Sequence, residues 1–122
     1  MARMLRPDRS IERVYLHRAP IDMRKQMDGL AILAKEAMRL DPFCGALFVF
    51  VNRRHNKLKM LCWERNGFIV WYKRLERDRF HWPRRIDETV LSLTGEQLNW
   101  LLDGYDVWRM KGHEALEFSA LS

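Results

Sequence analysis

The first third of the chain carries a strand-like run of hydrophobic positions and then a helix-like one. Residues 14–17 (Val-Tyr-Leu-His) are largely β-branched or aromatic, which is typical of a short strand. From Asp22 to about Leu40, apolar residues recur at steps of three and four, so one face of a helix is apolar. Asp22 is placed to cap this helix, and Asp41-Pro42 closes it. The pattern predicts a strand followed by a long amphipathic helix.

The middle of the chain predicts three more strands. Ala46 to Val51 is a nearly continuous apolar run, which favours a strand covered on both faces. Residues 57–64 and 68–75 flank Asn66-Gly67, a dipeptide typical of two-residue hairpin turns. These two runs are therefore predicted to pair as a β-hairpin.

The pairing within this hairpin follows from the turn. If Asn66 and Gly67 form it, Trp63 lies opposite Val70, Leu61 opposite Tyr72, and Lys59 opposite Arg74. Both faces of the hairpin then carry apolar residues, so we expect it to be covered on both sides. Facing Lys59 and Arg74 side chains would repel each other by up to about 1 kcal/mol, and an anion bound between them would remove that cost.

The last third of the chain predicts short elements. Residues 77–83 have the composition of a turn and a short edge strand, which Pro83 ends. Thr94 and Gln97 match the capping-box spacing, and the helix that they open, Thr94 to Leu102, stops before Gly104.

These elements predict a single α+β domain. We expect a mostly antiparallel sheet of four or five strands, with one long helix packed across it and a short C-terminal helix at its side. The predicted domain covers residues 13–106, between a basic N-terminal arm (residues 1–12) and a C-terminal tail (residues 107–122).

Composition agrees with one folded domain in the cytoplasm. The 122 residues are 48% hydrophobic and 31% charged, which suits a single folded core. The sequence contains no run of eighteen apolar residues, and no apolar segment of a secretory signal follows the basic start, so we expect no membrane partner. Cys44 and Cys62 lack metal-ligand spacing and are expected to be thiols that pack in the interior.

Positive charge is concentrated in one segment. Residues 53–85 hold eleven basic residues and three acids, a net charge of +8, whereas the whole chain carries +6. Such a field attracts polyanions, and the aromatic residues among the charges could stack on bases. Alternating strands with an aromatic core face produce the same composition, so a purely structural explanation stays open.

The predicted nucleic-acid contacts are phosphate contacts. The candidates are Arg53, Arg54, Lys57, Lys59, Lys73, Arg74, Arg77 and Arg79, with Trp82 and Arg85 as weaker candidates. The chain has no helix-turn-helix or zinc-finger spacing, so no sequence-specific recognition is predicted.

Catalytic motifs are not found. The four histidines stand singly, and there is no nucleophile elbow and no phosphate-binding loop. Asp87-Glu88, or Asp103 with Asp106, could hold a metal ion, but acids of this kind are common on surfaces. The sequence therefore predicts a protein that is not an enzyme, with no cofactor and no metal site.

Several stretches together resemble a known family. They are 14–16 with 22–25 and 28–30; 41–43 with 47–50 and 53–54; 57–59 with 72–76, 79–80 and 82–83; and 93–94 with 97–98, 101–102 and 104. From about Val14 to Asp106 the chain resembles the small accessory protein of the insertion-sequence-66 family, its second reading frame of the TnpB type. This family is distinct from the RNA-guided nucleases that share the label. The chain departs from the family pattern at Ala19, Gln26 and Cys44.

The resemblance implies a bacterial mobile-element protein that assists transposition beside a much larger transposase. It brings no catalytic residues. Two hypotheses follow. The protein binds DNA through the basic segment, and the affinity falls steeply with salt. Alternatively it is an adapter that binds the transposase, with the tail from Trp108 to Phe118 as its contact. Pairing of two copies through an exposed strand edge or the tail is also open.

Overall fold

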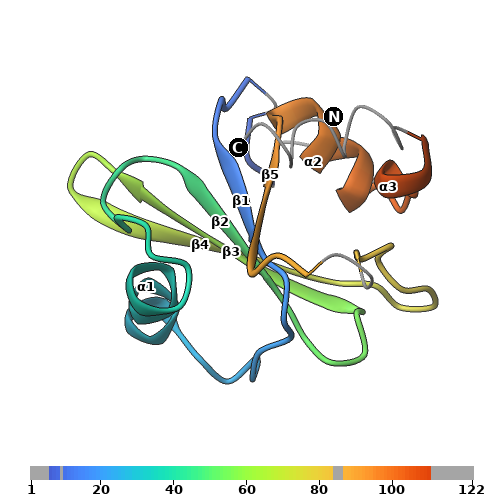
Figure 1. Ribbon diagram of the computed structural model, residues 1–122, viewed down its shortest axis with the longest axis horizontal. Coiled ribbons are helices and arrows are strands. Elements are labelled where there is room, and N and C mark those ends of the chain that lie inside the picture. The colour runs from blue at the N-terminus through green and yellow to red at the C-terminus, as the bar shows by residue number, and fades with distance from the viewer. Residues whose placement is uncertain (1–5, 9, 84–86, 111–122) are drawn as a thin grey trace.

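The computed structural model describes residues 6–8, 10–83 and 87–110 (Figure 1). Arg85, most of the predicted tail and the start of the N-terminal arm therefore lie outside the described residues. The elements are β1 (Val14–His17), α1 (Met27–Glu36), β2 (Leu47–Val51), β3 (Lys57–Glu64), β4 (Gly67–Arg74), β5 (Val90–Leu93), α2 (Gly95–Leu102) and α3 (Val107–Met110).

The strands form one five-stranded sheet in the order β4-β3-β2-β1-β5. Only β1 and β2 pair in parallel among the described strands, and the other three neighbouring pairs are antiparallel. A parallel pair needs a crossover, and α1 supplies it between β1 and β2. The prediction of a mostly antiparallel sheet is confirmed.

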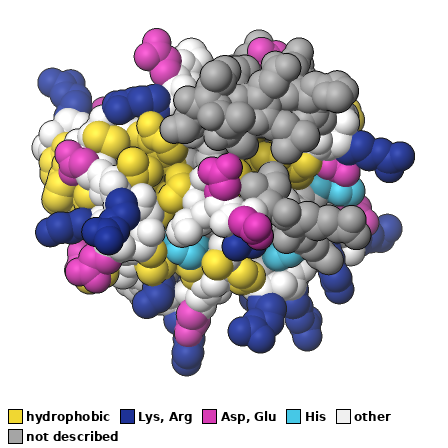
Figure 2. All heavy atoms as spheres, in the orientation of Figure 1, with side chains coloured by type: hydrophobic (Ala, Val, Ile, Leu, Met, Phe, Trp, Pro, Cys, Tyr) yellow, Lys and Arg dark blue, Asp and Glu magenta, His cyan; other side chains and the backbone are white. Residues whose placement is uncertain are grey.

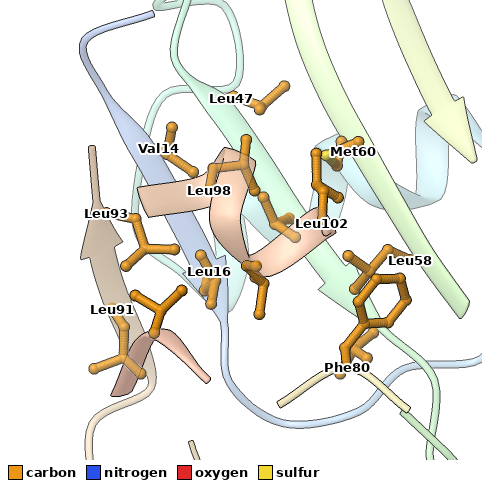
Figure 3. Close-up of a cluster of buried hydrophobic side chains, with 14 of the residues drawn as sticks. Val14, Leu16, Leu47, Leu58, Met60, Phe80, Leu91, Leu93, Leu98 and Leu102 are labelled. Atoms are coloured by element: carbon orange, nitrogen blue, oxygen red, sulfur yellow. The ribbon is translucent and has the colours of Figure 1, made fainter. Parts of the chain in front are cut away.

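Helices cover both faces of the sheet. Alternate residues of β2 point to opposite faces, and each set belongs to a separate hydrophobic cluster. On one face Phe48 and Phe50 pack with Leu30 and Ala34 of α1. On the other face the cluster includes residues of α2 (Figure 3); its members from β1, β2 and α2 are Val14, Leu16, Leu47, Val49, Val51, Leu98, Leu101 and Leu102. All five residues of β2 are buried, as the apolar run predicts.

The hairpin register differs from the prediction by two residues. Glu64 pairs with Gly67, so Arg65 and Asn66 form the turn, and Arg65 takes the positive φ of 55°. Trp63 then lies opposite Phe68, and their rings pack edge to face at 5.0 Å, a favourable cross-strand contact. The shift of two keeps every side chain on its predicted face, because strand side chains alternate with a period of two. The predicted opposition of Lys59 and Arg74 is wrong.

The first helix is shorter than predicted. It begins at Met27 rather than near Asp22, and no side chain caps it. The Asp22 carboxylate instead accepts hydrogen bonds from the side chain and backbone N–H of Arg24, which lower the pKa of Asp22 to about 2. Since this carboxylate is engaged in a local turn, it is not available to a helix.

The predicted edge strand at residues 77–83 is also wrong. Phe80 and Trp82 turn into the core, and the described part of this segment has no strand pairing. The fifth strand is instead β5, which the sequence analysis missed and which pairs antiparallel with β1. No helix in the described part of the chain is long and apolar enough to cross a membrane.

The start of α2 confirms the capping box. Thr94 Oγ1 accepts from the backbone N–H of Gln97 at 3.1 Å, and Gln97 Oε1 accepts from the N–H of Thr94 at 2.9 Å. Both bonds satisfy amides that the helix itself leaves unpaired.

We expect Thr94→Ala to lower the free energy of unfolding by about 1 kcal/mol, because Gln97 loses the acceptor for its backbone N–H. Urea denaturation measures the change. Thr94→Ser keeps the hydroxyl and serves as the control. Equal stability of the Ala and Ser variants would contradict a role for this cap.

Candidate nucleic-acid interface

Six of the predicted phosphate-binding residues gather where the strands of the hairpin end. The turn between β2 and β3, the start of β3, the end of β4 and the segment after it meet there. We call this group the basic end; it consists of Arg53, Arg54, Lys57, Arg74, Arg77 and Arg79. The acids within these stretches are Glu76 and Asp78, so the charge is +4. Figure 2 shows basic side chains at the lower right of the molecule, where the β2–β3 turn and the segment after β4 lie in Figure 1.

Asn52 builds the turn that carries Arg53 and Arg54. Its Oδ1 accepts from the backbone N–H groups of Asn56 and Lys57, each at 3.0 Å, and its Nδ2 donates to Asn56 Oδ1 at 2.7 Å. His55 takes a positive φ of 60° inside the turn and is buried. Arg53 and Arg54 are exposed at the tip. The turn is therefore held by side-chain hydrogen bonds while its charges face solvent.

The segment after β4 is fixed beside this turn. The Leu75 N–H donates to Asn56 O at 2.8 Å, and the Phe80 N–H donates to His55 O at 2.7 Å. Both hydrogen bonds hold the intervening backbone against the turn. Arg77 and Arg79 lie between the two anchored positions, and both are exposed. The structure thus places them next to Arg53 and Arg54, which are more than twenty residues away in sequence.

Lys57 and Arg74 face each other across the strand pair at this end. The predicted opposition of two basic residues therefore exists, but with Lys57 in place of Lys59. The Arg74 guanidinium also forms an ion pair with Glu76, 3.0 Å away. Both partners of this ion pair are largely exposed, so water screens it and it contributes little to stability.

Lys59 and Lys73 do not join the basic end. Lys59 Nζ donates to Lys25 O at 2.7 Å on the α1 face and lies 5.8 Å from the centre of the Tyr72 ring. Lys73 Nζ donates to Leu102 O at 2.7 Å, at the C-terminal end of α2. Burial, and then the charge of Arg6, lower the pKa of Lys73 from its ordinary value. Both ammonium groups satisfy backbone carbonyls of the fold.

Aromatic side chains are largely absent from the basic end. Trp82 is 7% exposed, and its Nε1 donates to Arg18 O at 2.8 Å, so it serves the core and not a bound base. Phe80 is buried as well. Trp63 and Phe68 flank the other end of the hairpin, where they pack with Phe43. Among the Phe, Trp and Tyr side chains between residues 53 and 83, only that of Tyr72 is more than half exposed, at 54%.

Sequence reasoning missed two residues at this site. Asn52 organises the turn, and an Asn at the start of a polar loop is a signal that could have found it. Arg18 follows the C-terminal end of β1, which is parallel to β2 and therefore stops at the same end of the sheet. Its Nε donates to Glu88 O at 2.7 Å. No local pattern in the sequence identifies this contact.

Of the acids considered as metal ligands, Asp103 and Asp106 have protein partners, whereas Asp87 and Glu88 are exposed. Asp103 pairs with Arg6 at 3.0 Å, and Asp106 lies 3.7 Å from His81 and caps the Arg109 N–H. Among the described residues, no three His, Cys, Asp or Glu side chains are grouped closely enough to hold a metal ion. Both cysteines are free; Cys62 is buried, which raises the pKa of its thiol, and Cys44 is half-buried.

Comparison with known proteins gives one family and two relatives. The model of the family described as "IS66 Orf2 like protein" matches residues 12–112. "Uncharacterized protein y4jC" of Sinorhizobium fredii is 33% identical over 108 residues, covering 88% of this chain and 91% of the relative. "Uncharacterized protein y4hO" of the same organism is 36% identical over 97 residues, covering 80% and 83%. No solved structure matches the chain significantly.

We expect Asn52→Ala to lower the free energy of unfolding by about 1–3 kcal/mol, since two backbone N–H groups lose their acceptor. Asn52→Asp keeps both acceptor bonds and is the matched control. Urea denaturation of the two variants measures the difference. If Asn52→Ala is as stable as Asn52→Asp, the side chain does not hold the turn.

Proposed function

This chain belongs to the IS66 Orf2-like family. From that premise we propose that it is a non-catalytic accessory protein of transposition and that it binds duplex DNA through the basic end. The observation that carries the proposal is the convergence of Arg53, Arg54, Arg77 and Arg79 on one exposed surface. Hydrogen bonds of the backbone hold the two segments that carry these arginines side by side.

Charge and geometry both favour phosphate as the ligand. The basic end has a charge of +4, and its five exposed arginines carry planar groups that can donate two hydrogen bonds to one phosphate. Lys57 and Arg74 face each other, and a phosphate between them would relieve their repulsion. Contacts of this kind position a protein on DNA without selecting a sequence.

The burial of the aromatic residues favours duplex over single-stranded DNA. Proteins that hold single strands stack exposed aromatic rings on unpaired bases. At the basic end, Phe80 and Trp82 are instead buried in the core. Arginine contacts to two phosphate backbones need no exposed ring, so a duplex suits this surface better.

The proposal assigns the chemistry of transposition to another protein. Cutting and joining DNA needs carboxylates that hold metal ions in a catalytic arrangement. Of the candidate metal ligands, Asp103 and Asp106 are engaged with Arg6 and His81, and no three His, Cys, Asp or Glu side chains of the described residues are grouped to hold a metal ion. A separate transposase would carry out the reaction while this protein holds DNA.

An adapter that binds the transposase without touching DNA is the second candidate. One observation favours it: Phe43 is 56% exposed and packs on Trp63 and Phe68 at the end of the hairpin away from the basic end. An exposed aromatic cluster is typical of protein contact surfaces. Such a complex would survive high salt, whereas DNA binding would not.

The test is fluorescence anisotropy of labelled duplex and single-stranded DNA over a salt series, with Arg53→Gln/Arg54→Gln compared with wild type. We expect tighter binding to the duplex. We expect the double variant to reduce the slope of log affinity against log salt by about 2, since two phosphate contacts are lost.

The matched control is Lys35→Gln/Arg39→Gln, which removes the same charge from the last turn of α1 and the turn that follows it, away from the basic end. It should leave the salt slope nearly unchanged. If both double variants reduce the salt slope equally, DNA responds to the overall charge of the protein and not to a site at the basic end. If the wild type does not bind DNA, the proposal is rejected and the adapter hypothesis takes its place.

A further inference from the structure

One edge of the sheet is long, and no strand or loop of the described residues pairs with it. β4 lies at the edge, is eight residues long, contains no proline and no acid, and is uncharged from Gly67 to Tyr72. The other edge strand, β5, has four residues and leads directly into the capped helix α2. Natural proteins shorten, charge or cover their edge strands, because open edges pair with other strands. β5 follows this rule, and β4 does not.

The hydrogen-bonding groups that β4 offers can be assigned from its register. Glu64 and Gly67 flank a two-residue turn, so they exchange hydrogen bonds, and every second pair along the hairpin does the same. The N–H and C=O groups of Phe68, Val70 and Tyr72 therefore point away from β3. Among the described residues, no backbone hydrogen bond from a turn or loop reaches these groups.

Side chains beside this edge are partly uncovered on both faces. Ile69 is 38% exposed on the face of α2, and Tyr72 is 54% exposed on the face of α1. β-branched and aromatic residues in this position gain from a cross-strand neighbour. The edge thus combines unpaired backbone groups with half-exposed apolar side chains.

We propose that β4 pairs antiparallel with β4 of a second copy of this chain, which joins the two five-stranded sheets into one continuous sheet. The distribution of charge selects this partner and direction. Lys73 and Arg74 stand at the C-terminal end of β4. Antiparallel pairing sets them beside the uncharged N-terminal part of the partner strand, whereas parallel pairing would bring both basic ends together.

The alternation of outward-pointing backbone groups along β4 makes the pairing self-complementary. Only even-numbered residues of β4 offer outward backbone groups, so even residues of one copy pair with even residues of the other. Directly opposed residues share a face, so Phe68, Val70 and Tyr72 of both copies meet on the face of α1. Ile69 and Trp71 meet on the face of α2. The two basic ends then lie at opposite ends of the joined strands, so pairing leaves them open.

The test is the mass of the full chain in solution, by analytical ultracentrifugation over a concentration series, for wild type, Tyr72→Pro and Tyr72→Ala. Proline removes an N–H that points away from β3, so the hairpin keeps its own ladder. We expect wild type and Tyr72→Ala to dimerise and Tyr72→Pro to be monomeric with an unchanged circular dichroism spectrum. A monomeric wild type, or a folded Tyr72→Pro that still dimerises, overturns the proposal.

If Tyr72→Pro does not fold, amide hydrogen exchange of the wild type tests whether β4 pairs with β4 of a second copy. The N–H groups of Phe68, Val70 and Tyr72 should exchange more slowly as protein concentration rises, because they are paired only in the dimer. Fast exchange of these three amides at concentrations where the protein is dimeric would show that another surface joins the copies. The experiment uses no DNA, so its result is independent of the proposed function.

Discussion

The burial of β2 on both of its faces is the constraint on which the rest of the structure depends. Leu47 to Val51 are all fully buried, and burying one such side chain contributes about 1.5–3 kcal/mol. A strand of this kind needs an apolar layer on each side. Because β1 and β2 are parallel, the connection between them crosses one face as α1, and α2 with the last third of the chain covers the other.

The same constraint explains why the arginines of this segment gather at the basic end. Because helices pack on both faces of the sheet, the half-buried Lys59 of β3 and Lys73 of β4 are accommodated where each ammonium reaches a backbone carbonyl. Phe80 and Trp82 are drawn into the core and hold the segment after β4 against the β2–β3 turn. The arginines around them remain outside. The concentration of positive charge at one exposed end follows from how the core is filled.

Two surfaces of different physical nature result. The basic end presents charge on a fixed backbone, and its interactions weaken with salt. The edge of β4 presents backbone hydrogen-bonding groups flanked by apolar side chains, and salt weakens such pairing little. The two surfaces meet only at Arg74, where β4 ends. A protein that pairs through one surface and binds a polyanion through the other would hold two segments of nucleic acid at a defined separation, a useful property in an accessory factor of transposition.

The sequence by itself determined the strands β1 to β4, the face on which each hairpin residue lies, the capping box of Thr94 and the excess of basic residues, because these depend on local spacing and composition. The predicted hairpin register was wrong by two residues, yet each side chain lies on its predicted face of the sheet, since strand side chains alternate with a period of two. Tertiary structure decided the rest. The observed turn brings Trp63 and Phe68 into contact, and β5 pairs with β1. Lys73 and Lys59 lie outside the predicted site because they donate to carbonyls at the end of α2 and in the turn before α1. Each of these outcomes depends on a partner supplied by another element or strand, which local pattern does not encode.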